Sequence, residues 1–357
     1  PLDLAFAIRA YLHVLKPQLV VLAETEFWPN FLRLAKVSGA KIAVVNARIS
    51  DRSFPGYRRW RGLLRPVLAN VDRFLAQGAQ DSERLLAIGA RAERVHVSGN
   101  LKFDVSAPQA APIVEQLRRA IPADAPVIVC GSTVELEESA LWGAFQAVLK
   151  DFPNAVMILA PRHPERFDAV AALAADFAAG LPEPVRKISG MPEMRFWRRS
   201  ALTANQPTDL ELRGGVLLLD SIGELAAIYS LATLAFVGGS LAPHGGHNIL
   251  EPAHFGKPIL VGPHTENFRD IIRIFTAANA LRVVQGLRQK ESQDNGNLAK
   301  TLLDLLHYPN EREALGQRAA EVVHAHAGAT ERSLQALTQL LAPASATAHI
   351  AEELAAK

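Results

Sequence analysis

Short apolar runs recur along the chain and predict buried β-strands. Segments with the apolar spacing of helices separate most of these runs, for example residues 139–149 and 166–177. Strands that alternate with helices pair in parallel, so the pattern predicts an α/β protein. The predicted strands cover residues 19–22, 41–45, 73–76, 95–98, 127–130, 155–159, 216–219, 234–237 and 258–261.

Prolines divide this pattern into domains. Residues 107–126 hold four prolines around one helical piece and are predicted to connect two doubly wound domains. The remaining parts are residues 1–106, residues 127–342 and an alanine-rich tail of residues 343–357. The irregular residues 180–215 are predicted to form a long loop or a hairpin insertion. Ligands of doubly wound sheets bind beyond the carboxyl ends of the strands, which directs attention to the loops there.

Composition fits two globular domains and excludes several classes of protein. The chain has 357 residues, of which 49% are hydrophobic, and a net charge of only +2. This charge gives no argument for binding nucleic acid. The single cysteine, Cys130, excludes an intramolecular disulfide framework and fits a reducing compartment. No apolar run has the length of a transmembrane helix, and the sequence shows no signal peptide.

Residues 236–270 carry the strongest sign of a ligand site. The apolar run 234–237 leads into Gly238 and Gly239, where a backbone without Cβ atoms can approach a ligand closely. A second glycine pair precedes Asn248 and a helical run, whose first N–H groups would favour an anion. The alternative is structural, with Asn248 as the N-cap and Glu251 as its capping-box partner. The glycine pairs favour the ligand site.

Four other loops at strand ends carry suggestive side chains, each with a structural alternative. Glu24 could act in acid-base chemistry or orient a sugar hydroxyl, unless its loop is simply solvated with Trp28 in the core. Arg162 suits a phosphate, although it could be a surface arginine. Gly223 could let a nucleotide approach the backbone or could make a tight turn. Residues 132–135 have the spacing of a capping box, which explains them without function.

The histidines near residue 251 raise the possibility of a metal site. Their spacing matches no known zinc pattern, so no metal and no cofactor are expected. Neither a G-x-S-x-G elbow, a Walker A sequence nor a G-x-G-x-x-G fingerprint occurs, which argues against a serine hydrolase, a P-loop kinase and a classical NAD enzyme. The histidines are His244, His247, His254 and His264.

Six motifs, in order, resemble one family over residues 19–341. They are ETEFWPN (24–30), NARISDRSFPGY (46–57), GNLKFD (99–104), PRHPERF (161–167), DSIGEL (220–225) and the glycine-rich stretch 236–268. The sequence is similar in these motifs to the 3-deoxy-D-manno-octulosonic acid (Kdo) transferases of lipopolysaccharide synthesis. The resemblance implies a GT-B fold, in which two Rossmann-like domains face each other across a cleft. It also implies transfer of Kdo from CMP-Kdo to a lipid A precursor, with inversion, at the cytoplasmic face of the bacterial inner membrane.

Matching motifs assign roles to individual residues. The resemblance implies that residues 1–106 bind the acceptor and residues 127–342 the nucleotide sugar. Glu24 and Lys102 would stabilise the transition state, and a cationic Lys102 would offset negative charge on the leaving CMP. Three segments would contact CMP, and they comprise Pro161 and Arg162; Ile222, Gly223 and Glu224; and Asn248, Ile249, Leu250 and Glu251.

The sequence departs from the family pattern in two places. Val134 and Leu136 replace a histidine and a glycine of the family's GSTH-x-GEE motif. The family's general base, a glutamate in a Ser-Val-Gly-Glu motif that follows a membrane anchor, is absent from these residues. The resemblance therefore implies that about a hundred residues precede Pro1 and that the N-terminal domain is incomplete here. This chain is accordingly expected to bind CMP but to transfer no Kdo.

A basic and aromatic stretch could contact a membrane. Residues 53–68 combine four arginines with Phe54, Tyr57, Trp60 and leucines, a composition typical of an interfacial helix. The structural alternative is a solvated arginine face above an apolar face packed in the core.

Two other functions also remain open at this stage: a GT-B transferase that uses a UDP-sugar, and a non-catalytic nucleotide-sugar binding module.

Overall fold

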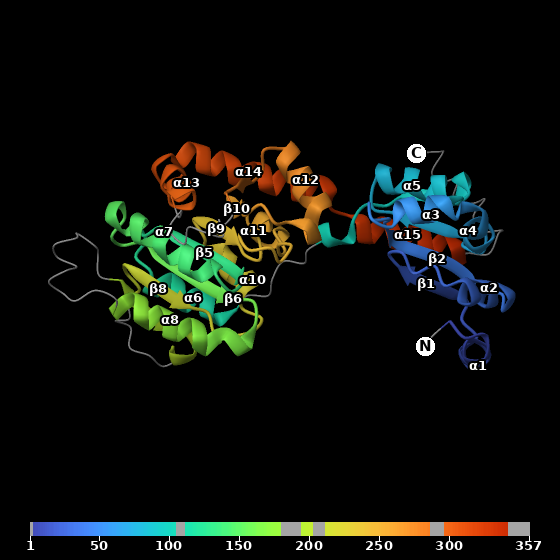
Figure 1. The fold of residues 1–357 in the computed structure, drawn as a ribbon, viewed down its shortest axis with the longest axis horizontal. Helices are drawn as coiled ribbons and strands as arrows, with labels where there is room; N and C mark the ends of the chain where they lie inside the picture. The colour runs from blue at the N-terminus through green and yellow to red at the C-terminus, as the bar shows by residue number, and fades with distance from the viewer. Residues whose placement is uncertain (1–2, 105–110, 180–193, 203–210, 286–295, 342–357) are drawn as a thin grey trace, which may run out of the picture. The chain divides into compact units, whose positions relative to one another are not determined.

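The computed structural model describes residues 3–104, 111–179, 194–202, 211–285 and 296–341 (Figure 1). The chain forms two compact units. The first comprises Pro1–Asp104 and His326–Lys357, and the second comprises Val105–Ala325. Each unit is built around its own parallel sheet, with four strands in the first and seven in the second among the described residues.

The first unit has the strand order β1-β2-β3-β4, with every pair parallel. Its core packs Leu32, Ile42, Phe74 and Leu85, each fully buried, between the sheet and the helices. The strands are β1 (Leu19–Ala23), β2 (Lys41–Ala47), β3 (Arg73–Ala76) and β4 (Val95–Val97). The helices that connect them are α1 (Ala5–Leu15), α2 (Pro29–Val37), α3 (Phe54–Arg59), α4 (Arg61–Leu68) and α5 (Ala79–Ile88).

Helix α15 (Ala329–Leu341) also belongs to the first unit, although it is the last described helix of the chain. The carboxylate of Asp104 accepts hydrogen bonds from the backbone N–H groups of Gly328 and Thr330. The guanidinium of Arg332 donates to the carbonyl oxygen of Ser98 at 2.7 Å. The structure thus differs from the predicted boundary, which placed residues 127–342 in one domain. Contacts between segments more than 200 residues apart fix this helix, and local sequence patterns do not show them.

The second unit has the strand order β11-β10-β9-β5-β6-β8-β7, again with every pair parallel. The order reverses between β5 and β9, which makes their carboxyl ends a topological switch point. The strands are β5 (Val127–Thr133), β6 (Val156–Pro161), β7 (Arg195–Arg198), β8 (Gly215–Leu218), β9 (Leu234–Val237), β10 (Ile259–Val261) and β11 (Arg282–Val283). The helices include α6 (Pro112–Ala120), α7 (Glu137–Asp151), α8 (Phe167–Ala179), α10 (Leu225–Ile228), α11 (Leu250–His254), α12 (Arg269–Ala277), α13 (Gly296–His307) and α14 (Pro309–His326).

Both faces of this sheet are covered, and successive residues of β5 point to opposite faces. Ile128 and Cys130 belong to one core cluster, whereas Val127 and Val129 belong to the other. Burial on both faces explains why the strands appear in the sequence as continuous apolar runs rather than as alternating patterns.

The predicted α/β class is confirmed, and each of the nine predicted runs overlaps a strand. The predicted connection is wrong in part, since α6 packs into the second unit's core through Ile113 and Leu117. Residues 105–110 lie outside the described residues. The prediction for residues 180–215 is also wrong in part, because β7 pairs with β8 in parallel and not as a hairpin. Residues 180–193 and 203–210 are not described. None of the described helices is long and apolar enough to cross a membrane.

Candidate functional site

Glycines allow close packing at the switch point of the second unit. A Cβ atom on Gly238 would lie 2.5 Å from the carbonyl oxygen of Ser132, and one on Gly239 would lie 2.7 Å from the ring of His247. Gly239 also has φ +67°, which favours glycine. The space that these two glycines leave is therefore filled by the protein itself. The prediction that the pair leaves room for a ligand is wrong in this respect.

A buried carboxylate holds the glycine loop that follows β9. Oε2 of Glu137 accepts hydrogen bonds from the N–H groups of Gly239 and Val134 at 2.8 and 3.1 Å. Oε1 accepts from Ser240 and Leu241 at 2.9 and 2.8 Å. The side chain is fully buried, and burial raises the pKa of Glu137 while these four N–H groups act to lower it. Glu137 thus ties the end of β5 to the loop after β9.

Sequence reasoning missed Glu137 and its neighbour Glu138. The predicted capping box of residues 132–135 does not form, since Glu135 is exposed and no side chain caps α7. The carboxylate of Glu138, also buried, instead accepts two hydrogen bonds from the guanidinium of Arg166 at 2.6 and 3.3 Å. The signal available in the sequence was a pair of carboxylates at the start of an otherwise apolar helix, directly after a strand.

Arg162, which follows β6, lies within electrostatic reach of both His247 and Glu251, which follow β9. Burial lowers the pKa of His247, and the charge of Arg162 lowers it further. Burial raises the pKa of Glu251, which a hydrogen bond from Asn248 and the charge of Arg162 partly counteract. Nε2 of His247 is buried and has no hydrogen-bond partner among the described residues. Arg162 itself is exposed, and its backbone N–H is held by the carbonyl oxygen of Thr133 at 2.9 Å.

Hydrogen bonds within the segment from Asn248 to Glu251 fix the start of α11. Oδ1 of Asn248 accepts the N–H of Leu250 at 3.1 Å, and its Nδ2 donates to the carboxylate of Glu251 at 3.1 Å. Glu251 therefore bonds the side chain of Asn248 rather than its backbone N–H, so the reciprocal capping box is not formed. Ile249 and Leu250 are fully buried, which leaves only their backbone groups for a ligand.

The loop after β8 presents the third predicted segment. Ile222 is 78% exposed, and a Cβ on Gly223 would meet no atom within 4 Å. Glu224 is partly buried and accepts hydrogen bonds from Arg199 and Ser221. Burial acts to raise its pKa, but these bonds and the charge of Arg199 hold the pKa of Glu224 below its ordinary value.

In the first unit, Glu24 and Lys102 follow strands of one sheet. Glu24, at the end of β1, has φ +60°, and its N–H donates to the carbonyl oxygen of Val45 on β2 at 3.0 Å. The buried side chain of Asn46, at φ +51°, accepts the N–H of Leu101 at 3.1 Å and so fixes the segment that carries Lys102. The loops of both predicted residues are thereby attached to the end of β2.

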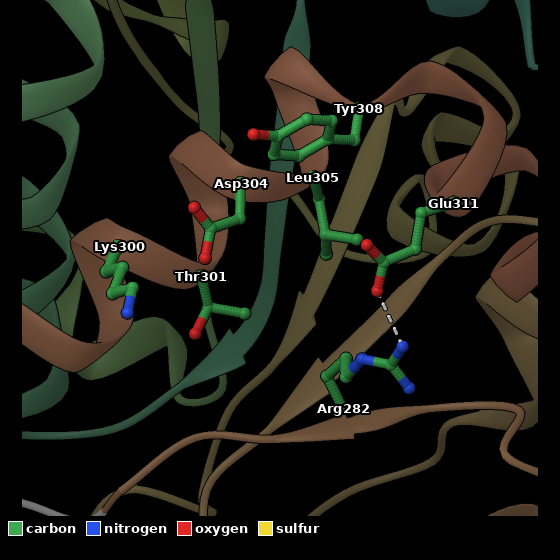
Figure 2. Close-up of a pocket in the computed structure, with 7 residues that line it drawn as sticks. All are labelled: Arg282, Lys300, Thr301, Asp304, Leu305, Tyr308 and Glu311. Atoms are coloured by element: carbon green, nitrogen blue, oxygen red, sulfur yellow. Dashed lines mark hydrogen bonds and ion pairs between the residues drawn. The ribbon is translucent and has the colours of Figure 1, made fainter.

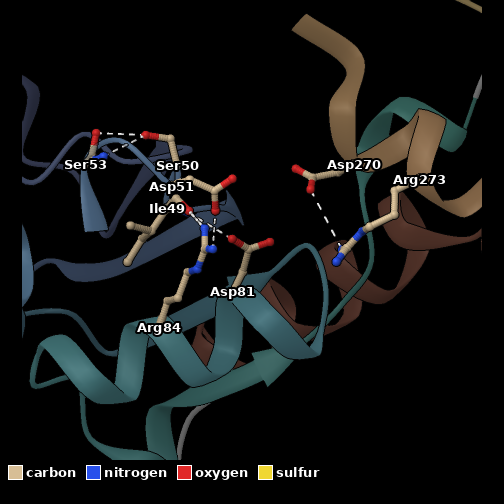
Figure 3. Close-up of polar contacts among 8 residues, drawn as sticks. All are labelled: Ile49, Ser50, Asp51, Ser53, Asp81, Arg84, Asp270 and Arg273. Atoms are coloured by element: carbon tan, nitrogen blue, oxygen red, sulfur yellow. Dashed lines mark hydrogen bonds and ion pairs between the residues drawn. The ribbon is translucent and has the colours of Figure 1, made fainter. Parts of the chain in front are cut away.

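Two further details of the loops after β1 and β2 concern Trp28 and the NARISD segment. The alternative that placed Trp28 in the core is wrong, because Trp28 is 41% exposed and donates to Glu26 at 2.6 Å. The guanidinium of Arg84 donates to the carbonyl oxygen of Ile49 and to the carboxylate of Asp51 (Figure 3). Asp81 accepts the N–H of Ile49 at 2.9 Å. Helix α5 thus fixes the NARISD segment.

Comparisons with known proteins show the family of this chain. A family model described as 3-Deoxy-D-manno-octulosonic-acid transferase (kdotransferase) matches residues 1–105. The 3-deoxy-D-manno-octulosonic acid transferase of Haemophilus influenzae is 32% identical over 342 residues, which cover 96% of this chain and 74% of that protein. The chain belongs to the Kdo transferase family. The Bordetella pertussis transferase is 38% identical over 349 residues, with 96% and 73% coverage.

A solved structure supports the fold of this Kdo transferase. A glycosyltransferase from Rickettsia africae matches with a TM-score of 0.53 and 13% identity, and the match covers 95% of this chain and 81% of that protein. At this identity the likeness concerns the fold alone. Together with the two parallel sheets, it confirms the predicted fold class, in which each unit is Rossmann-like.

The structure shows why the family motif has a glycine at one position where this chain departs from it. Leu136 stands where the GSTH-x-GEE pattern has glycine, and its φ is +76°, in the region that favours glycine. Its side chain is 67% exposed, so packing does not compensate this strain. Val134, in place of the histidine, is buried.

A cavity of about 430 Å³ lies elsewhere in this Kdo transferase. Its lining includes Arg282, the first residue of edge strand β11, which forms an ion pair with Glu311 at 2.7 Å (Figure 2). The amino end of a strand is opposite the edge where the predicted nucleotide segments lie. None of the lining residues is a predicted site residue; they are Arg282, Lys300, Thr301, Asp304, Leu305, Tyr308 and Glu311.

Proposed function

We propose that this Kdo transferase moves Kdo from CMP-Kdo to a lipid A precursor with inversion, at the cytoplasmic face of the inner membrane. The observation that carries the proposal is that strands β6 and β9 flank β5 in parallel, so Arg162 after β6 comes within electrostatic reach of His247 and Glu251 after β9. Two of these residues lie in motifs matched to the family's CMP contacts, and the chain belongs to that family.

The donor side can hold a nucleoside monophosphate such as CMP without a metal ion. Arg162 is exposed and cationic, so its guanidinium can bind the single phosphate of CMP in a fork. Glu251 repels a phosphate but accepts hydrogen bonds from ribose hydroxyls. The exposed backbone at Ile222 and Gly223 offers N–H groups on another side. One phosphate facing an arginine and backbone dipoles needs no divalent cation for neutralisation.

On the acceptor side, Glu24 and Lys102 are proposed to stabilise the transition state. Lys102 follows β4, and its exposed ammonium can offset the negative charge that develops on CMP as the glycosidic bond breaks. Glu24 is held at a positive φ, and such strain at a strand end is typical of functional positions. Its carboxylate can balance the positive charge that develops on the sugar ring.

A surface of the first unit supports a lipid acceptor. Trp60 and Leu63, at α3 and α4, are 59% and 68% exposed. Four exposed arginines adjoin them in the sequence. Exposed aromatic and aliphatic side chains among arginines fit an anionic membrane surface. We name this surface the basic aromatic patch; it consists of Arg58, Arg59, Trp60, Arg61, Leu63 and Arg65.

Competition between nucleotides tests the donor. Calorimetric titration with CMP and with UDP, each with and without EDTA, should show CMP binding more tightly and should show no effect of chelation. Preferential binding of UDP would reject CMP-Kdo as the donor and favour a UDP-sugar transferase. Loss of CMP binding in EDTA, restored by Mg²⁺ or Zn²⁺, would reject the metal-free site.

A further inference from the structure

Edge strand β7 places two arginines beside the loop that follows β8. The strands pair in parallel with Arg198 opposite Leu218, so the residues that follow each strand lie side by side at the carboxyl edge of the sheet. Both arginines contact residues 220–224, which carry one of the three proposed nucleotide contacts.

Arg199 holds the far end of this loop through Glu224. Its Nε and Nη2 donate to the two carboxylate oxygens at 3.0 and 2.8 Å, in the forked geometry that arginine and carboxylate favour. The side chains are only 23% and 21% exposed. Nη1 donates to the carbonyl oxygen of Leu202 at 3.1 Å, which fixes the guanidinium from the other side.

Arg198 holds the near end of the loop through Asp220. Its Nε donates to the Asp220 carboxylate at 2.8 Å, and the backbone and hydroxyl of Ser200 donate to the same group at 2.7 and 2.6 Å. Burial acts to raise the pKa of Asp220, but the bonds from Ser200 and Arg198 hold it below the ordinary value. The side chain of Asp220 is only 2% exposed, so these hydrogen bonds and not solvent stabilise its charge.

Between these two anchors, Ile222 and Gly223 are exposed and touch little of the protein. We propose that Arg198 and Arg199 are positioning residues, which hold residues 220–224 in the conformation that receives the nucleotide. Arg199 also neutralises Glu224, whose unpaired charge would repel an anionic donor. This inference rests on the proposed function, because the ligand it invokes is CMP.

The test compares the CMP affinity of four proteins by calorimetry, well below their unfolding midpoints. They are the wild type, Arg199→Ala, Arg199→Lys and the control Arg213→Ala. Arg213 is exposed and pairs only with the exposed Glu211 among the described residues. We expect Arg199→Ala to weaken CMP binding about tenfold. Arg199→Lys should recover only part of this loss, because an ammonium cannot form the fork. Arg213→Ala should bind as the wild type does.

A double variant separates positioning from general damage to the fold. In the Arg199→Ala background, Glu224→Gln keeps the backbone through which residue 224 would contact CMP and removes the unpaired charge. It should therefore recover part of the CMP affinity, whereas it cannot repair a damaged fold. Wild-type affinity in Arg199→Ala, with weakened binding in Arg162→Ala, would overturn this inference and leave the proposed function intact. Equal loss in the single and double variants would overturn the role of charge neutralisation. Absence of CMP binding by the wild type would reject the proposed function itself.

Discussion

The carboxylate of Glu137 accepts the backbone N–H of Gly239, 102 residues away in the sequence, at 2.8 Å and so joins the segments that follow β5 and β9. Four further N–H groups donate to the same carboxylate. The start of α7 and the glycine loop after β9 therefore bind the same buried carboxylate. This carboxylate acts together with a direct bond from the N–H of Gly238 to the carbonyl oxygen of Gly131 at 2.8 Å.

Glu137→Gln should destabilise the second unit by about 2–3 kcal/mol. All five bonds to the carboxylate come from N–H donors, so an amide nitrogen would face at least two of them and leave them unsatisfied. Glu135→Gln, at an exposed position two residues earlier, is the matched control and should be neutral. Urea unfolding measures both variants. A Glu137→Gln protein as stable as this control would show that the buried carboxylate is dispensable.

Leu136→Gly should stabilise the protein by about 0.5 kcal/mol. Relief of the strain at φ +76° is worth about 1–2 kcal/mol, and the conformational entropy of glycine costs about half of that. Little packing is lost, since Leu136 is 67% exposed. Glu135→Gly, at a residue without a positive φ, should instead destabilise. If the two glycine variants unfold at the same urea concentration, Leu136 is not strained.

Glu251→Gln should raise stability at neutral pH and weaken CMP binding. Burial raises the pKa of Glu251 above its ordinary value of 4.5, so folding disfavours the ionised form. This penalty is absent well below pH 4.5 and becomes complete as the pH rises through the folded-state pKa. The stability gained by Glu251→Gln should therefore grow across that window and stay constant above it. Thermal unfolding from pH 4 to 8 would contradict the burial argument if the gain were the same at every pH.

The basic aromatic patch should bind anionic vesicles. Replacement of Trp60 and Leu63 by serine should reduce binding to vesicles that contain phosphatidylglycerol by about tenfold, because both side chains would insert into the interface. Val37→Ser is the control, since Val37 is 76% exposed on the same unit but outside the patch. Sedimentation with vesicles measures the effect. Equal binding by all three proteins would place the membrane contact elsewhere.

Sequence patterns predicted most of the sheets but not the connections between distant segments. Nine strands were predicted, and most of them are continuous apolar runs because they are buried on both faces, whereas β1 and β4 are partly exposed. Strand β7 was missed because its sequence, RFWR, is charged at both ends, as an edge strand tolerates. Strand β11 has only two residues. Helix α15 was assigned to the wrong unit because Asp104 and Ser98, which hold it, are more than 200 residues away.

For the candidate site, motifs indicated the segments but not the residues that support them. Arg162 stood out because it follows an apolar strand and its guanidinium suits a phosphate, and Asn248 and Glu251 because glycine pairs precede them. The buried partners that hold these segments, Glu137 and Glu138, resemble ordinary helix-start carboxylates in the sequence. Only the structure shows that Glu137 binds backbone N–H groups after β9 and that Glu138 binds the side chain of Arg166.

The central claim is that the loops after β6, β8 and β9 hold CMP, and calorimetry of Arg162→Ala tests it most directly. Loss of the phosphate contact should weaken CMP binding by about 1–3 kcal/mol with the fold intact, and Glu251→Ala should show a loss of similar size. Arg213→Ala serves as the control for removal of a surface charge. The account predicts weaker binding in the first two variants and wild-type binding in the third. Unchanged CMP affinity in both Arg162→Ala and Glu251→Ala would contradict it.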